Sequence, residues 1–196
     1  MLNKNRNIVY ILSIGVLLAI CAGIAYAAFT DKAKVLGASF SVGSADIKFY
    51  SQLNLPPEPS NLIDELAGPV LTNIGQTWSQ DYPIKIYNTG TSTLSLGSHA
   101  NYETANDPSE LRQDISVAIH EWNDANYDGI VDPGEMDPTP IAKKTIIKWK
   151  TEGIGLGQIN VGQFRSLVLR FSTENLSATK QGKTGLFDFE FESAQL

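Results

Sequence analysis

Apolar and polar residues alternate along much of the chain, which is the pattern of β-strands that bury one face. The clearest alternation covers residues 184–192, where Phe187, Phe189 and Phe191 alternate with acidic residues. The same period predicts further strands at residues 167–171, 115–120 and 84–87. Weaker patterns predict strands at residues 38–42, 45–50, 93–97, 145–150 and 158–161.

Turns that contain glycine or proline separate most of these runs, so the strands are expected to be short. Many short strands with one buried face predict an all-β fold, specifically a jelly-roll-like antiparallel β-sandwich over residues 38–196. Only a few short helices are expected, at residues 62–66 with Ser60 as the cap and at residues 110–113 with Ser109 as the cap.

The N-terminal region predicts export. Two basic residues precede an uncharged stretch whose apolar centre, residues 8–20, has the length of a signal-peptide core rather than a membrane span. Small residues then predict cleavage after Ala27, or after the neighbouring Ala28, so residues 1–27 are expected to be a signal peptide. Two alternatives stay open, an uncleaved membrane anchor and a lipoprotein signal at Cys21. The predicted location is outside the cell, secreted or at the cell surface.

Charge and cysteine content narrow the classes of function. The net charge of −6 argues against nucleic acid as a partner, because phosphate binding needs a surplus of basic residues. Removing Lys4 and Arg6 with the signal peptide leaves 13 of the 15 basic residues against 21 acidic ones, a net charge of −8. Cys21 is removed as well, so the mature chain has no disulfide and no thiol nucleophile. Its stability must come from the core, from a metal or from neighbouring subunits.

The strongest local motif is an acidic stretch at residues 124–135. It fits the twelve-position calcium loop, in which oxygens at positions 1, 3, 5, 7, 9 and 12 bind Ca²⁺. The candidate ligands are Asp124, Asn126, Asp128, the backbone carbonyl of Ile130, Asp132 and Glu135. The helices that usually flank such a loop are not expected here. The alternative is therefore an acidic hairpin loop whose Asn, Asp and Gly residues only serve the turn.

A second motif, His120-Glu121, could open a zinc-protease signature. That signature requires another histidine four residues after the first on one helical face, but position 124 is aspartate in a segment that is expected to be a strand. His99 is the only other histidine, so the ligands for a catalytic zinc are few. The alternative is a surface histidine at the end of a strand, and no catalytic residue is predicted.

Several motifs, in their order along the chain, resemble the TasA/camelysin family. The segment at residues 27–31 resembles the junction from the signal peptide into an F-[ST]-D segment, and residues 38–47 resemble the family's F-x-x-G-x-x-D-[LI] strand. The later matches are Ile84-Lys85-Ile86-Tyr87-Asn88-Thr89-Gly90, the acidic hairpin at residues 124–135, and Gln181-Gly182-Lys183 followed by residues 187–191 and Ala194-Gln195. The chain departs from the family mainly in a long polar and proline-rich insertion, residues 51–80, whose role the sequence does not reveal.

The resemblance implies a jelly-roll subunit that is exported through a dedicated signal peptidase and assembles with copies of itself into extracellular matrix or surface fibres, with accessory matrix proteins as further partners. It also implies that the mature N-terminal segment completes the sheet of the next subunit. Residues 28–37 carry Phe29, Val35 and Leu36, and an extended apolar tail is suited to strand addition. The alternatives are a tail that folds back on its own sheet, a camelysin-like cell-surface metalloprotease, and a monomeric calcium-stabilised adhesin.

Overall fold

The computed structural model describes residues 44–71 and 74–196. The predicted signal peptide (residues 1–27), the cleavage positions Ala27 and Ala28, and the predicted strand at residues 38–42 lie outside the described residues. So does the predicted donor tail with Phe29, Val35 and Leu36.

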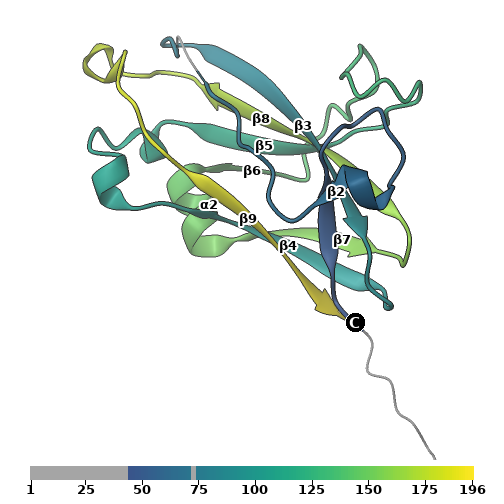
Figure 1. The fold of residues 1–196 in the computed structure, drawn as a ribbon. Coiled ribbons are helices and arrows are strands. Elements are labelled where there is room, and N and C mark those ends of the chain that lie inside the picture. Colours follow the sequence, from purple (N-terminus) through teal and green to yellow (C-terminus); the bar gives the residue numbers. More distant parts are fainter. Residues whose placement is uncertain (1–43, 72–73) are drawn as a thin grey trace, which may run out of the picture. The chain divides into compact units, whose positions relative to one another are not determined.

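The described residues form two antiparallel sheets (Figure 1). The strands of the first sheet, in spatial order, are β2 (Leu62–Ile63), β1 (Ile47–Tyr50), β3 (Trp78–Asn88), β8 (Phe164–Thr173), β5 (Ser116–Glu121) and β6 (Ala142–Thr145). Those of the second sheet are β7 (Ile154–Ile159), β4 (Leu94–Asn101) and β9 (Asp188–Gln195). The helical pieces are α2 (Ile146–Glu152) and four 3-10 turns, η1 (Pro59–Asn61), η2 (Thr104–Asn106), η3 (Leu111–Gln113) and η4 (Ala178–Lys180).

The chain passes repeatedly from one sheet to the other, as it does from β3 to β4, from β4 to β5, and from β6 through α2 to β7. Neighbouring strands such as β3 and β8 are therefore distant in sequence. This arrangement confirms the predicted all-β, jelly-roll-like antiparallel sandwich with few short helices. Within the described ranges, no helix combines the length and apolar character needed to cross a bilayer.

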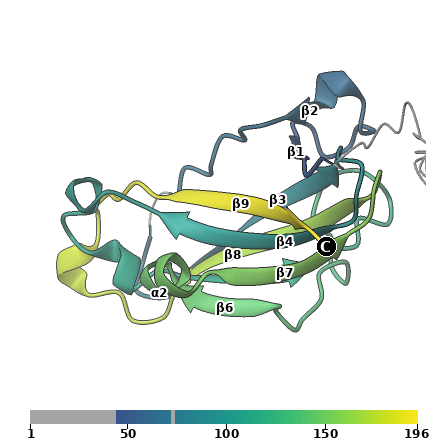
Figure 2. The ribbon, with the colours of Figure 1, turned by 90° about the horizontal axis from the view of Figure 1, so that it is seen from below.

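The core fills the space between the two sheets (Figure 2). Alternation places Ile84 and Ile86 of β3 on the inner face, where both are almost fully buried. The second sheet contributes the aromatic row predicted at residues 187–191. Phe191 packs edge-on against Phe49 of β1, with ring centroids 5.5 Å apart. Figure 2 shows β3 and β9 along one side of the sandwich, and α2 and β6 along the opposite side.

The predicted strand at residues 145–150 is wrong, because most of this stretch forms the helix α2. Lys148 and Lys150 alternate with Ile147 and Trp149, which also satisfies the period of a strand. In the structure, however, Ile146 and Trp149 are the buried pair, and residues three apart share one face of a helix. The next strand, β7, consequently begins at Ile154 and overlaps the predicted strand at residues 158–161 only at its end.

The two predicted helical turns also differ from the structure. At residues 62–66 the helical prediction is wrong: the 3-10 turn η1 ends at Asn61, and Leu62–Ile63 pairs with β1. The second turn is present as η3, but Ser109 is not its cap. The buried carboxylate of Asp107 accepts the backbone N–H groups of Leu111 and Arg112, at 2.8 and 3.2 Å.

Candidate metal loop and open sheet edge

The acidic loop at residues 124–135 connects β5 to β6 and brings three of the predicted calcium ligands together. The amide nitrogen of Asn126 donates to Asp128 Oδ2 at 2.9 Å and to Asp132 Oδ2 at 3.1 Å. Asp128 also accepts the backbone N–H of Ile130 at 2.8 Å. The Asn126 amide thus bridges two carboxylates that would otherwise repel each other.

Glu135, the predicted twelfth-position ligand, closes the loop through hydrogen bonds. Its carboxylate accepts the backbone N–H groups of Ala125 and Asp132 and the indole N–H of Trp122, at 3.1 to 3.2 Å. The backbone carbonyl of Glu135 accepts the N–H of Asn123 at 2.8 Å. These contacts hold the two ends of the loop together.

Asp124, the predicted first ligand, differs from the other predicted ligands in two ways: it is buried, and it pairs with a lysine. Its residue is only 6% exposed, and its Oδ2 lies 2.7 Å from the ammonium of Lys85, which is 3% exposed. The same oxygen accepts the backbone N–H of Gly129 at 3.1 Å. Among the described residues, Asp124 Oδ1 has no hydrogen-bond partner.

Three aromatic rings surround the Lys85 ammonium, at 5.2 Å for Trp122, 5.7 Å for Phe164 and 6.0 Å for Tyr50. We call these three rings, Lys85 and Asp124 the Lys85 cluster. Burial, with a smaller contribution from Tyr87, raises the pKa of the Tyr50 hydroxyl to about 12. The ammonium and carboxylate of this cluster therefore face each other in apolar surroundings on the outer face of the first sheet.

Residues 51–63, which follow β1, contact the Lys85 cluster. The backbone carbonyl of Leu53 accepts a second hydrogen bond from the Lys85 ammonium, at 2.7 Å. Asn61 is 3% exposed and fixes the turn before it, because its side chain makes five hydrogen bonds of 2.8 to 3.3 Å to Ser51, Gln52, Leu55 and Pro56. We call residues 51–63 the anchored segment.

Gly129 is required where the acidic loop meets the anchored segment. Its φ of +77° lies in the left-handed region, and a Cβ built there would stand 2.9 Å from Leu53 Cβ. Glycine therefore allows the loop to approach Leu53 closely while its N–H points to Asp124.

The described residues contain no group of three or more His, Cys, Asp or Glu side chains arranged to hold a metal ion. Calcium stays a prediction, since the hydrogen-bonded arrangement does not test binding. Asp137, which follows the loop, has a carboxylate that accepts the backbone N–H of Thr139 at 2.8 Å.

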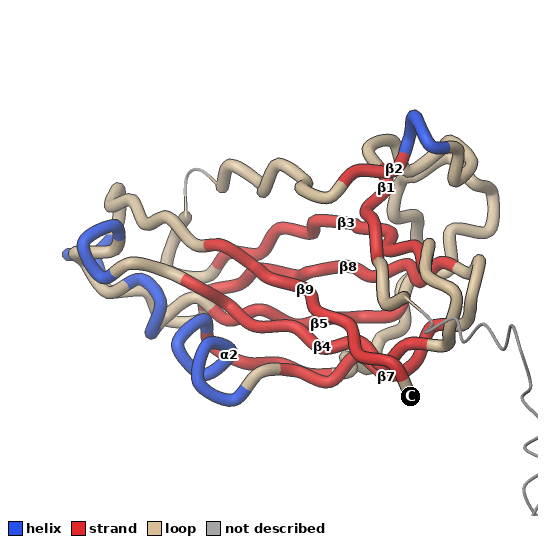
Figure 3. The backbone as a smooth tube through the Cα atoms, turned by 60° about the horizontal axis from the view of Figure 1, so that its bottom comes forward, coloured by secondary structure: helices blue, strands red, loops and turns tan. Residues whose placement is uncertain are grey.

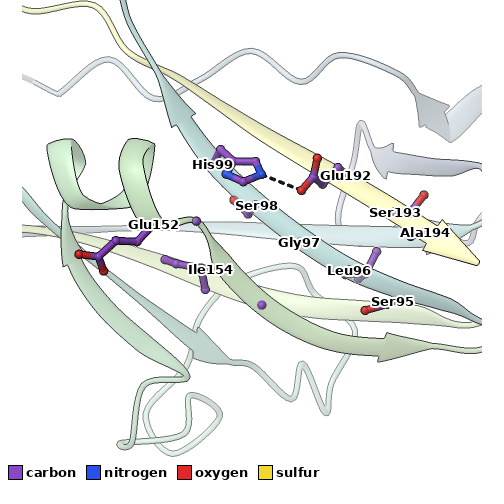
Figure 4. Close-up of a pocket in the computed structure, with 12 residues that line it drawn as sticks. Ser95, Leu96, Gly97, Ser98, His99, Glu152, Ile154, Glu192, Ser193 and Ala194 are labelled. Atoms are coloured by element: carbon purple, nitrogen blue, oxygen red, sulfur yellow. Dashed lines mark hydrogen bonds and ion pairs between the residues drawn. The ribbon is translucent and has the colours of Figure 1, made fainter. Parts of the chain in front are cut away.

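The two histidines lie in different sheets. His120, on β5, is 5% exposed and not the surface residue expected from sequence, and its Nδ1 bonds to the carbonyl of Asp137 at 2.8 Å. His99, on β4, lines a shallow depression of about 490 Å³ over the second sheet, where its Nε2 lies 2.7 Å from Glu192 Oε1 (Figure 4). The sequence motif at His120 and Glu121 therefore does not meet the second histidine.

A different feature lies along β3. One edge of this strand pairs with β8 from Trp78 to Tyr87, but on the other edge β1 pairs only with Ile86, Tyr87 and Asn88. In the described part of the chain, no strand pairs with that second edge from residue 78 to residue 85. We call this stretch the open edge.

Pro83 lies in the middle of the open edge. Ser166 of β8 accepts the N–H of Trp122 from the β5 side, so by alternation the backbone of Val168 also faces β5. Pro83 is opposite Val168, and its ring nitrogen therefore faces the open edge, which lacks one N–H donor there.

Residues 64–71, which we call the cover segment, run from β2 back along β3 (Figure 3). Leu66 and Leu71 are partly buried against the core, whereas Val70 is 85% exposed. Between residues 65 and 71, the one backbone group that is hydrogen bonded to another described residue is the carbonyl of Ala67, which accepts from the Tyr82 hydroxyl. The cover segment thus shields the core without forming a strand.

Comparison with protein-family profiles finds no match, and a search of curated proteins finds none either. The structure itself defines the class, an all-β antiparallel sandwich with an open edge on one strand. The resemblance to the TasA/camelysin family stays a prediction from the motifs.

Sequence reasoning missed both the Lys85 cluster and the open edge. Alternation placed Lys85 opposite Ile84 and Ile86, which is correct, but residues far along the chain cover that outer face. The local signal is a lysine between two isoleucines in the middle of a strand. The open edge depends on how far β1 extends, which no local pattern encodes.

Proposed function

We propose that this protein is an exported structural subunit that assembles into extracellular fibres by donating its N-terminal segment to the next subunit. The observation that supports this proposal is the open edge of β3, which is shielded by a segment that forms no strand. An unpaired edge beside apolar side chains is where an added strand gains both backbone hydrogen bonds and burial.

The donor that we propose is residues 28–37 of a second copy of the chain. The open edge has eight residues, so it needs a strand of about 27 Å, and ten extended residues reach about 33 Å. In such a strand Phe29, Ala33 and Val35 share one face. That face would lie toward the core, where the partly buried side chains of Leu66 and Leu71 now pack.

The donor must displace the cover segment, and the attachments of that segment favour this exchange. Its described backbone contact is the hydroxyl of Tyr82 on the Ala67 carbonyl. A donor strand would replace it with a ladder of main-chain hydrogen bonds along β3, interrupted at Pro83. Each subunit would therefore be more stable in the fibre than alone.

The test is electron microscopy of the purified exported protein and of a variant that lacks residues 28–37. The deletion should abolish filaments and leave a soluble β-rich domain that binds the matching peptide when it is added in trans. Filaments of normal length from the truncated protein would overturn the donor-strand assignment.

Two matched substitutions sharpen the test. Phe29→Asp places a charge on the face that we expect to be buried and should block assembly, because burying an unpaired charge is costly. Thr30→Asp places the same charge on the opposite face and should leave filaments intact. Tyr82→Phe keeps the ring but frees the cover segment, so filaments should grow faster than those of the unmodified protein.

The metalloprotease and adhesin alternatives remain untested predictions. Neither has an observation in the described residues that favours it over the fibre subunit. Zinc-dependent proteolysis by particles that form no filaments would favour the protease.

A further inference from the structure

Lys85 and Asp124 are oppositely charged, buried and in direct contact, although they are 39 residues apart in sequence. Their side chains are only 4% and 2% exposed. Taking two charges out of water costs more than their attraction returns unless the remaining polar atoms are also satisfied. Here Asp124 Oδ1 is not, because no described residue donates to it.

We propose that Lys85 and Asp124 condense to form an intramolecular amide bond between β3 and the acidic loop. A proton first moves from the Lys85 ammonium to the Asp124 carboxylate 2.7 Å away, because an ammonium nitrogen has no lone pair with which to attack. The bond between Lys85 Nζ and Asp124 Cγ then forms, and the bond between Cγ and Oδ1 breaks. Oδ1 leaves as water with two of the three ammonium protons, and the third proton stays on the amide nitrogen. The two opposite charges cancel, and no atom changes its oxidation state. The reaction therefore needs no oxidant, reductant or co-reactant.

The contacts around the pair fit the product better than they fit the separate ions. The unsatisfied oxygen, Oδ1, is the atom that leaves. The retained oxygen, Oδ2, keeps the backbone N–H of Gly129 at 3.1 Å, and the amide N–H keeps the carbonyl of Leu53 at 2.7 Å. The product is neutral, which suits a site walled by three aromatic rings.

The same geometry supplies the means of reaction. Fixed apposition of two reacting groups is equivalent to effective concentrations of about 10⁵–10⁸ M in well-oriented cases. The Gly129 N–H lies where negative charge develops on Oδ2 during attack, and a preorganised donor in a dry site stabilises that charge. Leu53 and the aromatic rings exclude bulk water, which would otherwise favour hydrolysis.

The experiment is intact-mass spectrometry of the purified, denatured protein, compared with the mass calculated from its own sequence and N-terminus. We expect a mass lower by one water molecule. Proteolysis should then yield a branched peptide that joins Lys85 to Asp124. Full mass for protein that has been kept folded would overturn the proposal.

Two lysine variants locate the bond. Lys85→Arg keeps the positive charge but should restore full mass, whereas a water loss that persists in this variant would overturn the assignment. Lys143→Arg is the matched control, because Lys143 lies 2.7 Å from Glu174 in an exposed pair and should leave the water loss unchanged. If Lys85→Arg does not fold, the branched peptide of the unmodified protein decides the question.

Formation of the amide bond does not depend on fibre assembly. A truncated protein that lacks residues 28–37 should still lose one water. The amide bond and calcium would compete for Asp124, since an amide at this position leaves the loop without the carboxylate at its first position.

Discussion

Two consecutive segments after β1, the anchored segment and the cover segment, cover neighbouring parts of the first sheet in opposite ways. The anchored segment is held by the buried amide of Asn61 and by the Leu53 carbonyl on Lys85. The cover segment lies on the core through Leu66 and Leu71, but the Tyr82 hydroxyl is its described backbone contact. The two segments thus differ in how far their polar groups are hydrogen bonded, and we expect local opening to cost less free energy in the cover segment than in the anchored segment.

The largest expected loss of stability comes from changing Asp124, the partner of the lysine that contacts the anchored segment. Asp124→Ala removes every bond between Asp124 and Lys85 and leaves the Lys85 ammonium buried and unpaired, which should lower the free energy of unfolding by about 3–5 kcal/mol. Denaturant unfolding measures this change, and hydrogen exchange should report that residues 51–63 lose protection while residues 64–71 change little. Glu174→Ala removes a carboxylate from an exposed pair and serves as the control. Equal losses in both variants would contradict the contrast between buried and exposed pairs.

Calcium would extend the tightly held region into the acidic loop. If the ion binds, saturating calcium at about 100 times the dissociation constant should raise the free energy of unfolding by about 2.7 kcal/mol. Asp128→Asn together with Asp132→Asn should abolish that increment without touching Asp124. Identical thermal unfolding curves in calcium and in chelator would mean that the loop only makes a turn.

Removing the Asn61 side chain tests the anchored segment directly. Asn61→Ala should cost about 2 kcal/mol, because several buried backbone groups lose their partner. Val70→Ala, in the cover segment, is the counterpart: its side chain is exposed, and unfolding should be nearly unchanged. Circular dichroism during denaturation measures both, and a larger loss for Val70→Ala would reverse the comparison.

The smallest expected effect concerns pH. A hydrogen bond from Lys143 lowers the pKa of Glu174 below its ordinary 4.5, and Lys144 does the same for Glu152. A folded-state pKa below the unfolded value adds stability above pH 4.5, and this stability is lost as the pH falls through the folded-state pKa. Because both carboxylates are exposed, the effect should be slight. Glu174→Gln should lower Tm slightly near neutral pH and not at about pH 3.

The sequence predicts the sandwich well where alternation reports burial on one face. The aromatic row of β9 and the isoleucines of β3 lie on the inner face as expected, and β9 begins at Asp188, four residues later than predicted. The prediction from alternation fails at α2, because the spacing of Ile146, Ile147 and Trp149 fits both a strand and a helix. Local sequence does not choose between them, whereas packing against β4 and β6 does.

The candidate sites show the same limit. The spacing of residues 124–135 predicts an acidic loop, and the side chains of three of its predicted ligands are joined by hydrogen bonds of the Asn126 amide. The pairing of Asp124 with Lys85 was not foreseen, because it joins β3 to a loop 39 residues later. Contacts of that kind depend on tertiary structure and leave no periodic trace in the chain.

Pro83 gives the open edge a further property. A strand that continues the sheet from this edge meets one missing N–H near its centre, so chains that add in an arbitrary register lose hydrogen bonds there. Unregulated stacking of the cross-β kind needs an unbroken ladder, and prolines are rare in segments that form it. Growth through this edge would therefore add folded domains one at a time, with one neighbour for each open edge. Filaments built in this way would resist conversion to amyloid.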